Sequence, residues 1–334
     1  MPISLFRRKT EEPAPAAAPR RRPAPRPPAA ESYEPAEPVT LTDDPLRRFL
    51  EQGRYGIVLA HGEAWAGQPG IEEVCRAATA AIDDRFALVP EGFAALPQTV
   101  DDHPGCPEID VPVEPFLLAL DPVTHAEFQL FVDAGGYQNL ELWPEDIWPH
   151  IIDFRDLTGR PGPRYWREGR HDRRLADHPV VGVCFYEAQA YVRWAGYRLP
   201  DEAEWQMAAS WRIRSSANTL RRYPWGDALD TTRCNIWASG VGRTVPVTEY
   251  ESGAAPNGVR QLIGNVWEWT ASDFSVVDAE GNPVVGDMLM KSIRGGAFDT
   301  YFPAQATSCF RTGLAALART HNVGFRAALD LGGR

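Results

Sequence analysis

Cys309 is the side chain in this sequence with the clearest potential for covalent or redox chemistry. It stands in the run TSCFR, between a Gly-Gly pair at 295–296 and a GFR triplet at 324–326. A thiolate can act as a nucleophile or as a soft metal ligand, whereas a buried thiol behaves as a small apolar group. The sequence therefore leaves two interpretations open: Cys309 is a catalytic thiol, or it is a packed loop residue.

Polar and aromatic side chains surround this cysteine in the sequence, and they predict a groove for a substrate or ligand. Arg311 has two alternatives: it lines this groove beside Asp299, Thr300 and Tyr301, or it pairs with a core acid. The predicted groove residues are Asp299, Thr300, Tyr301, Ser308 and Arg311.

Composition excludes several classes of protein. The 334 residues carry a formal net charge of −11, which argues against general binding to nucleic acid or to an anionic membrane. The longest apolar runs are shorter than the roughly 20 residues of a membrane span. Five scattered cysteines without a Cys-x-x-Cys pair predict no disulfide framework and a reducing, cytoplasmic location.

The amino-acid composition and the spacing of apolar residues change twice along the chain. Residues 1–42 are rich in Pro, Ala, Glu and Arg, and we expect a disordered arm. We expect it to serve as a solubilising tail or tether, and the alternative is a docking peptide. Residues 43–84 predict a small helical segment that begins at DPLRRFLEQG, although YGIVLA within it is typical of a strand. Residues 85–334 predict one irregular α+β domain, since short apolar runs alternate with Gly, Pro, Asn and Asp.

Three helices in this chain can be placed from their start and stop signals. Thr124 with Glu127 forms a capping box at the start of one helix, and a Gly-Gly pair ends it. Residues 185–210 predict two helices that are broken at Gly196 and Pro200. Asp201 and Glu204 form the capping box of the second of these.

A series of motifs identifies the chain as resembling a known family. In order they read FALVPEGF, HPVVGVCFYEAQAYVRWAGYRLPDEAEW, YPWGD, CNIWASG, QLIGNVWEW, IRGGAF and NVGFRAAL. This series resembles the formylglycine-generating-enzyme family, also called sulfatase-modifying-factor domains, over residues 86–330. The resemblance implies an irregular variant of the C-type-lectin fold with little regular secondary structure.

The resemblance also implies a copper- and oxygen-dependent oxidase that converts a cysteine of a sulfatase to formylglycine. Its copper(I) ion is held by two cysteines after the Gly-Gly turn, and Cys309 matches the second of them. The first is missing, because Asp299 or Thr300 stands near its position. One thiolate cannot form a dithiolate site. The sequence therefore predicts that copper binding is weak or absent.

Calcium is a further expectation from the resemblance, since the family carries structural calcium bound by oxygen ligands. Asn235 and Ile236 match one site. Gly264, Val266 and Glu268 match the other, in which Gln261 occupies a further ligand position. Ser239 and Gln261 depart from the acidic or Asn residues usual in the family. The alternative is that Asn235 and Glu268 hydrogen-bond loop backbone.

A branch of the family forms sulfur–carbon bonds on histidine derivatives with iron held by an N-terminal helical bundle. None of the seven histidines here has the spacing of those ligands, so we reject that function. Two functions remain. One is an oxidase-type modifier of a peptide or small molecule that lacks the paired cysteines. The other is a non-catalytic module that binds a peptide, protein or small molecule, a class that includes display proteins diversified by retroelements. With either function we expect a monomer.

Overall fold

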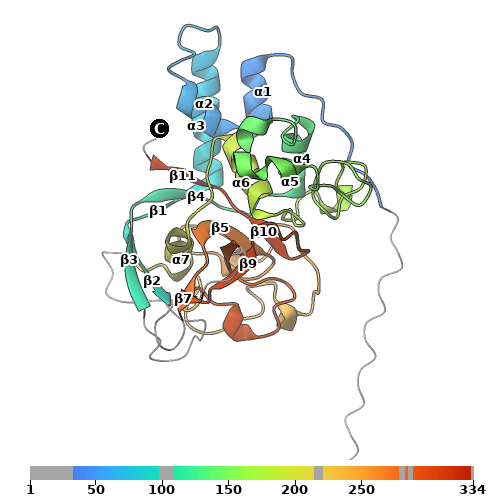
Figure 1. Ribbon diagram of the computed structural model, residues 1–334. Coiled ribbons are helices and arrows are strands. Elements are labelled where there is room, and N and C mark those ends of the chain that lie inside the picture. The colour runs from blue at the N-terminus through green and yellow to red at the C-terminus, as the bar shows by residue number, and fades with distance from the viewer. Residues whose placement is uncertain (1–32, 98–107, 214–220, 278–282, 285–288, 332–334) are drawn as a thin grey trace, which may run out of the picture. The chain divides into compact units, whose positions relative to one another are not determined.

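The computed structural model describes residues 33–97, 108–213, 221–277, 283–284 and 289–331. These residues form an α+β structure in which short helices and strands are joined by long loops (Figure 1). The expected fold class is confirmed. None of the helices in the described residues has the length and the hydropathy that a membrane span requires. Residues 1–32 of the predicted disordered arm lie outside the described residues.

Residues 34–36, which the sequence assigned to the arm, lie along the loop at 171–173. The amide of Ala36 donates to the carbonyl of His171, and the amide of Arg173 donates to the carbonyl of Glu34. Arg173 and Glu34 also form an ion pair. This part of the predicted arm is therefore hydrogen-bonded to the folded body.

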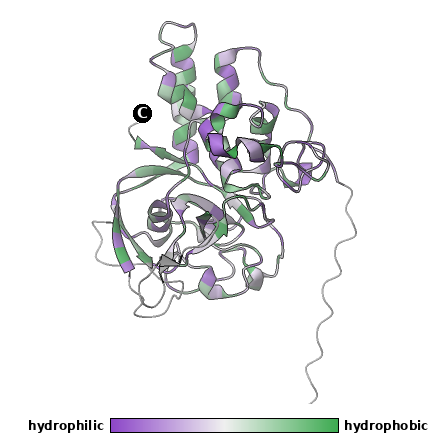
Figure 2. Ribbon diagram, in the orientation of Figure 1, coloured by the Kyte–Doolittle hydropathy of each residue, from purple (hydrophilic) through white to green (hydrophobic). Residues whose placement is uncertain are grey.

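The N-terminal segment consists of three helices, which are α1 (Pro45–Glu51), α2 (Tyr55–His61) and α3 (Ile71–Arg85). Asp44 caps α1 by accepting from the amides of Leu46 and Arg47. The strand predicted at YGIVLA is wrong, because these residues form α2. The apolar side chain of Val58 is buried, because α2 packs against α1 and α3. Figure 2 shows hydrophobic and hydrophilic residues on alternate faces of these helices.

The helices of the body begin at the predicted caps. Thr124 and Glu127 form the capping box of α4 (His125–Asp133), and Asp201 and Glu204 form that of α7 (Glu202–Ser210). Helix α6 (Phe185–Ala195) ends at Gly196, as expected. The remaining helical turns are α5 (Trp148–Ile151), η1 (Leu140–Leu142), η2 (Glu145–Ile147), η3 (Arg173–Leu175), η4 (Trp237–Ser239), η5 (Glu251–Gly253) and η6 (Pro303–Gln305).

Two sheets connect distant parts of the chain. The three-stranded sheet has the order β1-β4-β11, and the four-stranded sheet has the order β10-β5-β8-β9. In the second sheet β10 runs parallel to β5, and the other neighbours are antiparallel. The strands are β1 (Phe86–Val89), β2 (Gly92–Pro97), β3 (Glu108–Val113), β4 (Phe116–Ala119), β5 (Trp267–Asp273), β6 (Val276–Val277), β7 (Pro283–Val284), β8 (Met290–Arg294), β9 (Thr312–Ala315), β10 (Val323–Phe325) and β11 (Ala328–Asp330).

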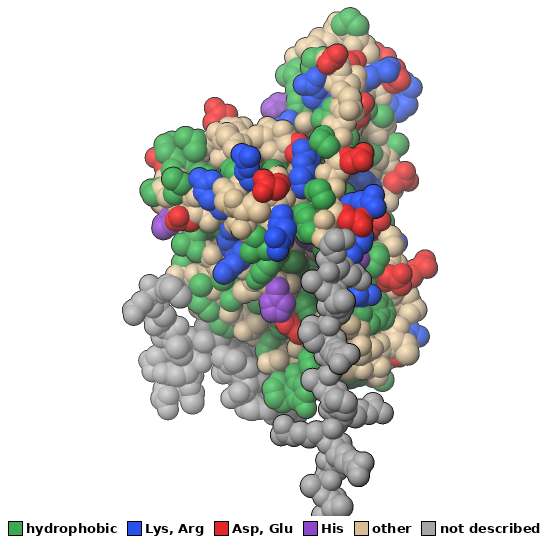
Figure 3. Space-filling model, turned by 90° about the vertical axis from the view of Figure 1, so that its right-hand side faces the viewer, with side chains coloured by type: hydrophobic (Ala, Val, Ile, Leu, Met, Phe, Trp, Pro, Cys, Tyr) green, Lys and Arg blue, Asp and Glu red, His purple; other side chains and the backbone are tan. Residues whose placement is uncertain are grey.

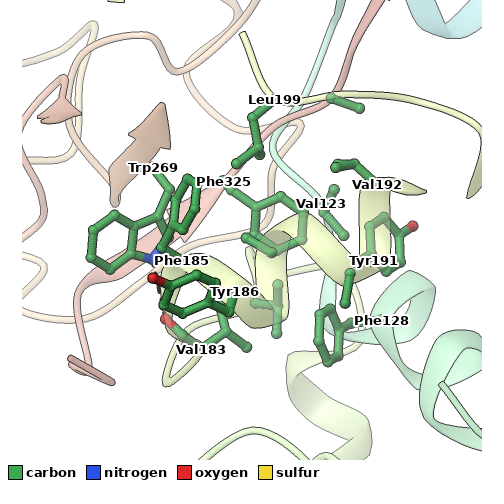
Figure 4. Packing of buried hydrophobic residues seen from close by; sticks show 14 of the residues in the cluster. Val123, Phe128, Val183, Phe185, Tyr186, Tyr191, Val192, Leu199, Trp269 and Phe325 are labelled. Carbon is green, nitrogen blue, oxygen red and sulfur yellow. Dashed lines mark hydrogen bonds between the residues drawn. The ribbon is translucent and has the colours of Figure 1, made fainter. Parts of the chain in front are cut away.

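The largest hydrophobic cluster joins α4 and α6 to the four-stranded sheet. Phe128 stacks on Tyr191, with ring centroids 5.4 Å apart, and meets Phe325 edge-on. Trp269 packs on Phe185, as Figure 4 shows. A second cluster lies around Trp205 of α7. These packed aromatic residues fix the ends of the loops that carry the candidate site.

Candidate functional site

The Gly-Gly turn after β8 orients the loop that carries the predicted groove. Gly295 and Gly296 have φ angles of 98° and 79°, which glycine adopts without strain. A Cβ atom on Gly295 would lie 2.6 Å from the carbonyl oxygen of Leu262. Immediately after the turn, the buried hydroxyl of Thr300 accepts the amide of Ala297 at 2.7 Å. Thr300 therefore stabilises the turn from the inside and does not face a ligand.

A buried ionic cluster lies beneath this loop. Glu202 accepts from Arg294 at 2.9 Å and from Arg311 at 2.8 and 3.0 Å. The hydroxyl of Ser292 donates to the same carboxylate at 2.7 Å. Two guanidinium groups therefore share one carboxylate, and all three charged side chains are buried. Burial lowers the pKa of Arg294, although Glu202 opposes this effect.

Cys309 is half-buried beside this cluster. Its Sγ atom lies 3.7 Å from the hydroxyl of Ser308, and its charge would interact with Arg294. Ser308 itself is buried, and its hydroxyl donates to the carbonyl of Arg221 at 2.5 Å. Of the predicted groove residues, Thr300, Ser308 and Arg311 are therefore interior residues, and Arg311 pairs with a core acid.

This environment does not fit a copper(I) dithiolate centre. Such a centre needs a second thiolate beside Cys309, and two further cysteines are poor thiolate donors. Burial raises the pKa of Cys184 well above its usual value and that of Cys234 to about 12. Cys184 caps α6, and the Cys234 thiol donates to the carbonyl of Asp230. Cys106 lies outside the described residues.

Three large aromatic side chains are exposed next to the Gly-Gly loop. Trp237, Tyr301 and Phe302 are 56%, 63% and 60% exposed. The rings of Trp237 and Tyr301 lie 6.0 Å apart, and those of Tyr301 and Phe302 lie 5.2 Å apart. The amide of Trp237 also donates to the carbonyl of Thr300, which ties η4 to the loop. We call Trp237, Tyr301 and Phe302 the aromatic surface.

Polar side chains adjoin the aromatic surface through Asp299. One carboxylate oxygen of Asp299 lies 3.1 Å from Nε2 of His321, and Asn322 donates to both oxygens at 3.1 and 3.2 Å. These partners hold Asp299, which remains partly exposed. Figure 3 shows a histidine and an acidic side chain above a group of hydrophobic side chains on one face of the molecule.

The first predicted calcium position contains a buried oxygen without a partner. The side-chain Nδ2 of Asn235 donates to the carbonyl of Arg243 and to the side chain of Asn265. The Oδ1 atom of Asn235 accepts no hydrogen bond in the structure. An unpaired buried oxygen is costly, and a cation can satisfy it. Asn235, with the backbone of Ile236 beside it, therefore fits a calcium ligand set in this respect.

The second predicted calcium position is arranged differently. Both oxygens of Glu268 are bound by Arg326, at 2.6 and 2.7 Å, and Trp205 donates to one of them at 2.8 Å. Gln261 donates to the carbonyls of Pro246 and Glu249. The Arg326 guanidinium thus occupies both oxygens of Glu268, and the Gln261 side chain turns its N–H groups toward the loop carbonyls. These two side chains therefore do not fit a calcium ion. Gly264 and Val266 contribute only backbone to this loop.

Of the predicted groove residues, Asp299 and Tyr301 lie at the surface. The sequence did not single out Trp237, His321 and Asn322. The motif CNIWASG gave no sign that its tryptophan is exposed, because Trp is more often buried than free. His321 and Asn322 precede β10, and their meeting with Asp299 depends on the parallel β10–β5 pairing. No group of three His, Cys, Asp or Glu side chains suited to a metal occurs among the described residues.

A family model described as the Sulfatase-modifying factor enzyme 1-like domain matches residues 71–331. The chain belongs to the formylglycine-generating-enzyme family. The match begins at α3, within the segment that the sequence set apart from the body.

Relatives in this family include active and inactive proteins. The formylglycine-generating enzyme of Streptomyces coelicolor is 32% identical over 288 residues, which cover 75% of this chain and 86% of the relative. The inactive C-alpha-formylglycine-generating enzyme 2 of Bos taurus is 28% identical over 68% of this chain and 81% of its own length. The hercynine oxygenase of Mycobacterium tuberculosis is 38% identical over 53% of this chain, which spans 41% of that relative.

Among solved structures, the protein CarF matches with a TM-score of 0.51 at 18% identity. The match covers 74% of this chain and 98% of CarF. At this identity the likeness shows the fold alone. The fold is the family's variant of the C-type-lectin fold.

Proposed function

We propose that this chain is a ligand-binding member of its family, and that the aromatic surface holds a peptide segment of a partner protein. The observation that carries this proposal is the exposure of Trp237, Tyr301 and Phe302 side by side. Clusters of exposed aromatic residues are uncommon on proteins without partners, and such residues dominate the energy of many interfaces. Asp299 beside them supplies a carboxylate at the rim of the surface.

The chemistry of the partner follows from charge. The protein carries a formal net charge of −11, and Asp299 lies at the edge of the aromatic surface. A neutral or basic peptide is favoured, since like charges would repel an acidic one. The relative described as inactive supports the idea that members of this family work without the oxidase reaction.

The aromatic surface can be tested with peptides selected from a random display library on the whole protein. We expect the selected peptides to contain Lys or Arg beside apolar residues, and to bind a triple variant, Trp237→Ser with Tyr301→Ser and Phe302→Ser, at least about tenfold more weakly. The matched control is Ile152→Ser with Leu157→Ser, which removes other exposed apolar side chains. Equal loss in both variants, or none in either, would contradict the proposal.

The second candidate function is oxidation through Cys309, which active relatives in the family favour. A copper(I) titration separates the two functions. We expect no stoichiometric tight binding, because Cys309 stands alone where the family has two cysteines, and one thiolate cannot form a dithiolate site. Tight binding that disappears in Cys309→Ser would support the oxidase instead. Cys75→Ser, on the far helical segment, is the control for non-specific thiol binding.

We also infer that calcium, if bound, is held at Asn235 and Ile236, where it would be a structural ion. The support is the buried Oδ1 atom of Asn235 without a donor. We expect the urea midpoint of unfolding to be higher in calcium than in EGTA, with magnesium giving a smaller effect because it holds its waters more tightly. An identical midpoint in all three solutions would exclude this ion.

A further inference from the structure

A cavity lies away from the aromatic surface, where the N-terminal helices meet the body. It has a volume of about 230 Å³ and is lined by the end of α1, the end of α3, the loop between β4 and α4, and one side of α6. It differs from the predicted groove in every lining residue. Its floor and walls include Phe86, Val123, Tyr191 and Tyr197.

The walls of this cavity are held by specific contacts. Arg54 donates to the carbonyl of Trp194 at 2.8 Å, and the hydroxyl of Tyr197 donates to the carbonyl of Gly53 at 3.1 Å. Gly56 packs directly on the end of α6, where an added Cβ would lie 2.1 Å from the carbonyl oxygen of Gly196. The helices therefore dock in one position, and the cavity is a fixed part of the structure.

Tyr191 provides a buried polar group in this cavity. The residue is 6% exposed, and among the described residues its hydroxyl has no hydrogen-bond partner. Figure 4 shows the Tyr191 oxygen directed away from Trp269 and Phe325, at the edge of the hydrophobic cluster. Electrostatic influence on its phenol comes from Tyr197, Arg85 and Tyr55, which also line the cavity. A bound molecule with a polar end would satisfy this hydroxyl.

The charges of the cavity lining are unbalanced. Arg85 forms an ion pair with Glu127, and Arg260 forms one with Asp121. Two further carboxylates, Glu51 and Asp84, line the cavity without a basic partner among the described residues. A positively charged ligand is favoured there, because it would offset this excess of negative charge.

We propose that this cavity binds a small organic amine of amino-acid size, with its ammonium group toward Glu51 and Asp84 and a second polar group on the Tyr191 hydroxyl. The apolar stem between the two groups would pack on Phe86 and Val123. Two independent features carry the proposal. One is the hydroxyl of a buried tyrosine without a hydrogen-bond partner, and the other is a pair of exposed carboxylates at the cavity without a basic partner among the described residues.

Four linear probes of equal chain length test the proposal on the full chain by calorimetry or ligand-observed NMR. These are 5-aminopentan-1-ol, pentylamine, pentane-1,5-diol and 5-hydroxypentanoate. We expect 5-aminopentan-1-ol to bind about tenfold more tightly than the neutral diol, and 5-hydroxypentanoate to bind most weakly. Binding of all four with equal affinity, or of none, would overturn the proposal.

Two variants assign the ends of the ligand. Tyr191→Phe removes only the hydroxyl oxygen, and it should lower the affinity for 5-aminopentan-1-ol by about fivefold while leaving that for pentylamine unchanged. Asp84→Asn should weaken both amines and leave the diol unchanged. Glu145→Gln, an exposed acid outside the cavity, is the control. If Tyr191→Phe affects both amines equally, the hydroxyl does not contact the ligand and the proposal is wrong.

Discussion

Substitution of His125 should reveal a buried neutral histidine that makes the protein sensitive to acid. Its Nδ1 atom accepts the indole N–H of Trp166 at 2.8 Å, so protonation there would place two donors against each other. Burial lowers the pKa of His125 to about 3, and the neighbouring His171 and His178 lower it further when charged, while Asp172 opposes them. The pKa of an unfolded histidine is about 6.5.

The sign of the effect follows from these two pKa values. The folded pKa is the lower one, so the unfolded chain binds the proton more readily, and the stabilisation is complete above about pH 6.5 and is lost as the pH falls toward 3. The slope is about 1.4 kcal/mol per pH unit for one proton. Between pH 7 and pH 4, His125 alone should lower the free energy of unfolding by about 3 kcal/mol.

Urea unfolding of the wild type and of His125→Gln at several pH values measures this difference. Gln can accept from Trp166 but does not titrate, so we expect the variant to be less stable at pH 7 and to approach the wild type as the pH falls. His150→Gln, on the surface, should follow the wild type at every pH. A constant difference between the wild type and His125→Gln from pH 7 to pH 4 would refute the reasoning.

Three further predictions concern the body and its helices. Glu202→Gln leaves two buried guanidinium groups without their carboxylate, and we expect urea unfolding to show a loss of about 3–5 kcal/mol. Thr300→Val leaves the buried amide of Ala297 without an acceptor and should cost about 1–3 kcal/mol in the same assay, whereas Thr300→Ser, which keeps the hydroxyl, should cost less. Gly56→Ala forces a Cβ atom against the end of α6. It should therefore lower the free energy of unfolding by about 1–3 kcal/mol and speed amide hydrogen exchange in α2. Unchanged exchange would show that the helix tolerates the added methyl group.

Local signals in the sequence were sufficient for the helix starts of the body. The boxes at Thr124 and Asp201 are confirmed because capping depends on residues three positions apart. The YGIVLA segment could not be assigned locally, since a short apolar run suits a strand or a buried helix. Its helical form depends on Gly56 meeting Gly196, which lies 140 positions away in the chain.

The candidate site was predictable only in part, because several of its contacts join residues that are far apart in the sequence. The missing first cysteine was visible in the sequence, and the interior position of Arg311 was one of two stated alternatives. The exposure of Trp237 and the contact of His321 with Asp299 require the folded loops, because η4 and the residues before β10 meet the Gly-Gly loop only in three dimensions. Unpaired oxygens such as Asn235 Oδ1 are likewise invisible before folding.

The strand order has a consequence for synthesis of the chain on the ribosome. Strand β4 pairs with β11, and β5 pairs with β10, so each sheet waits for a strand near residue 330. A nascent chain that has not reached this point has an open strand edge in both sheets, and the carboxylate of Glu268 has no Arg326 to neutralise it. The body can therefore complete both sheets only after β11 has left the ribosome, and the interval before this is when molecular chaperones have most to protect.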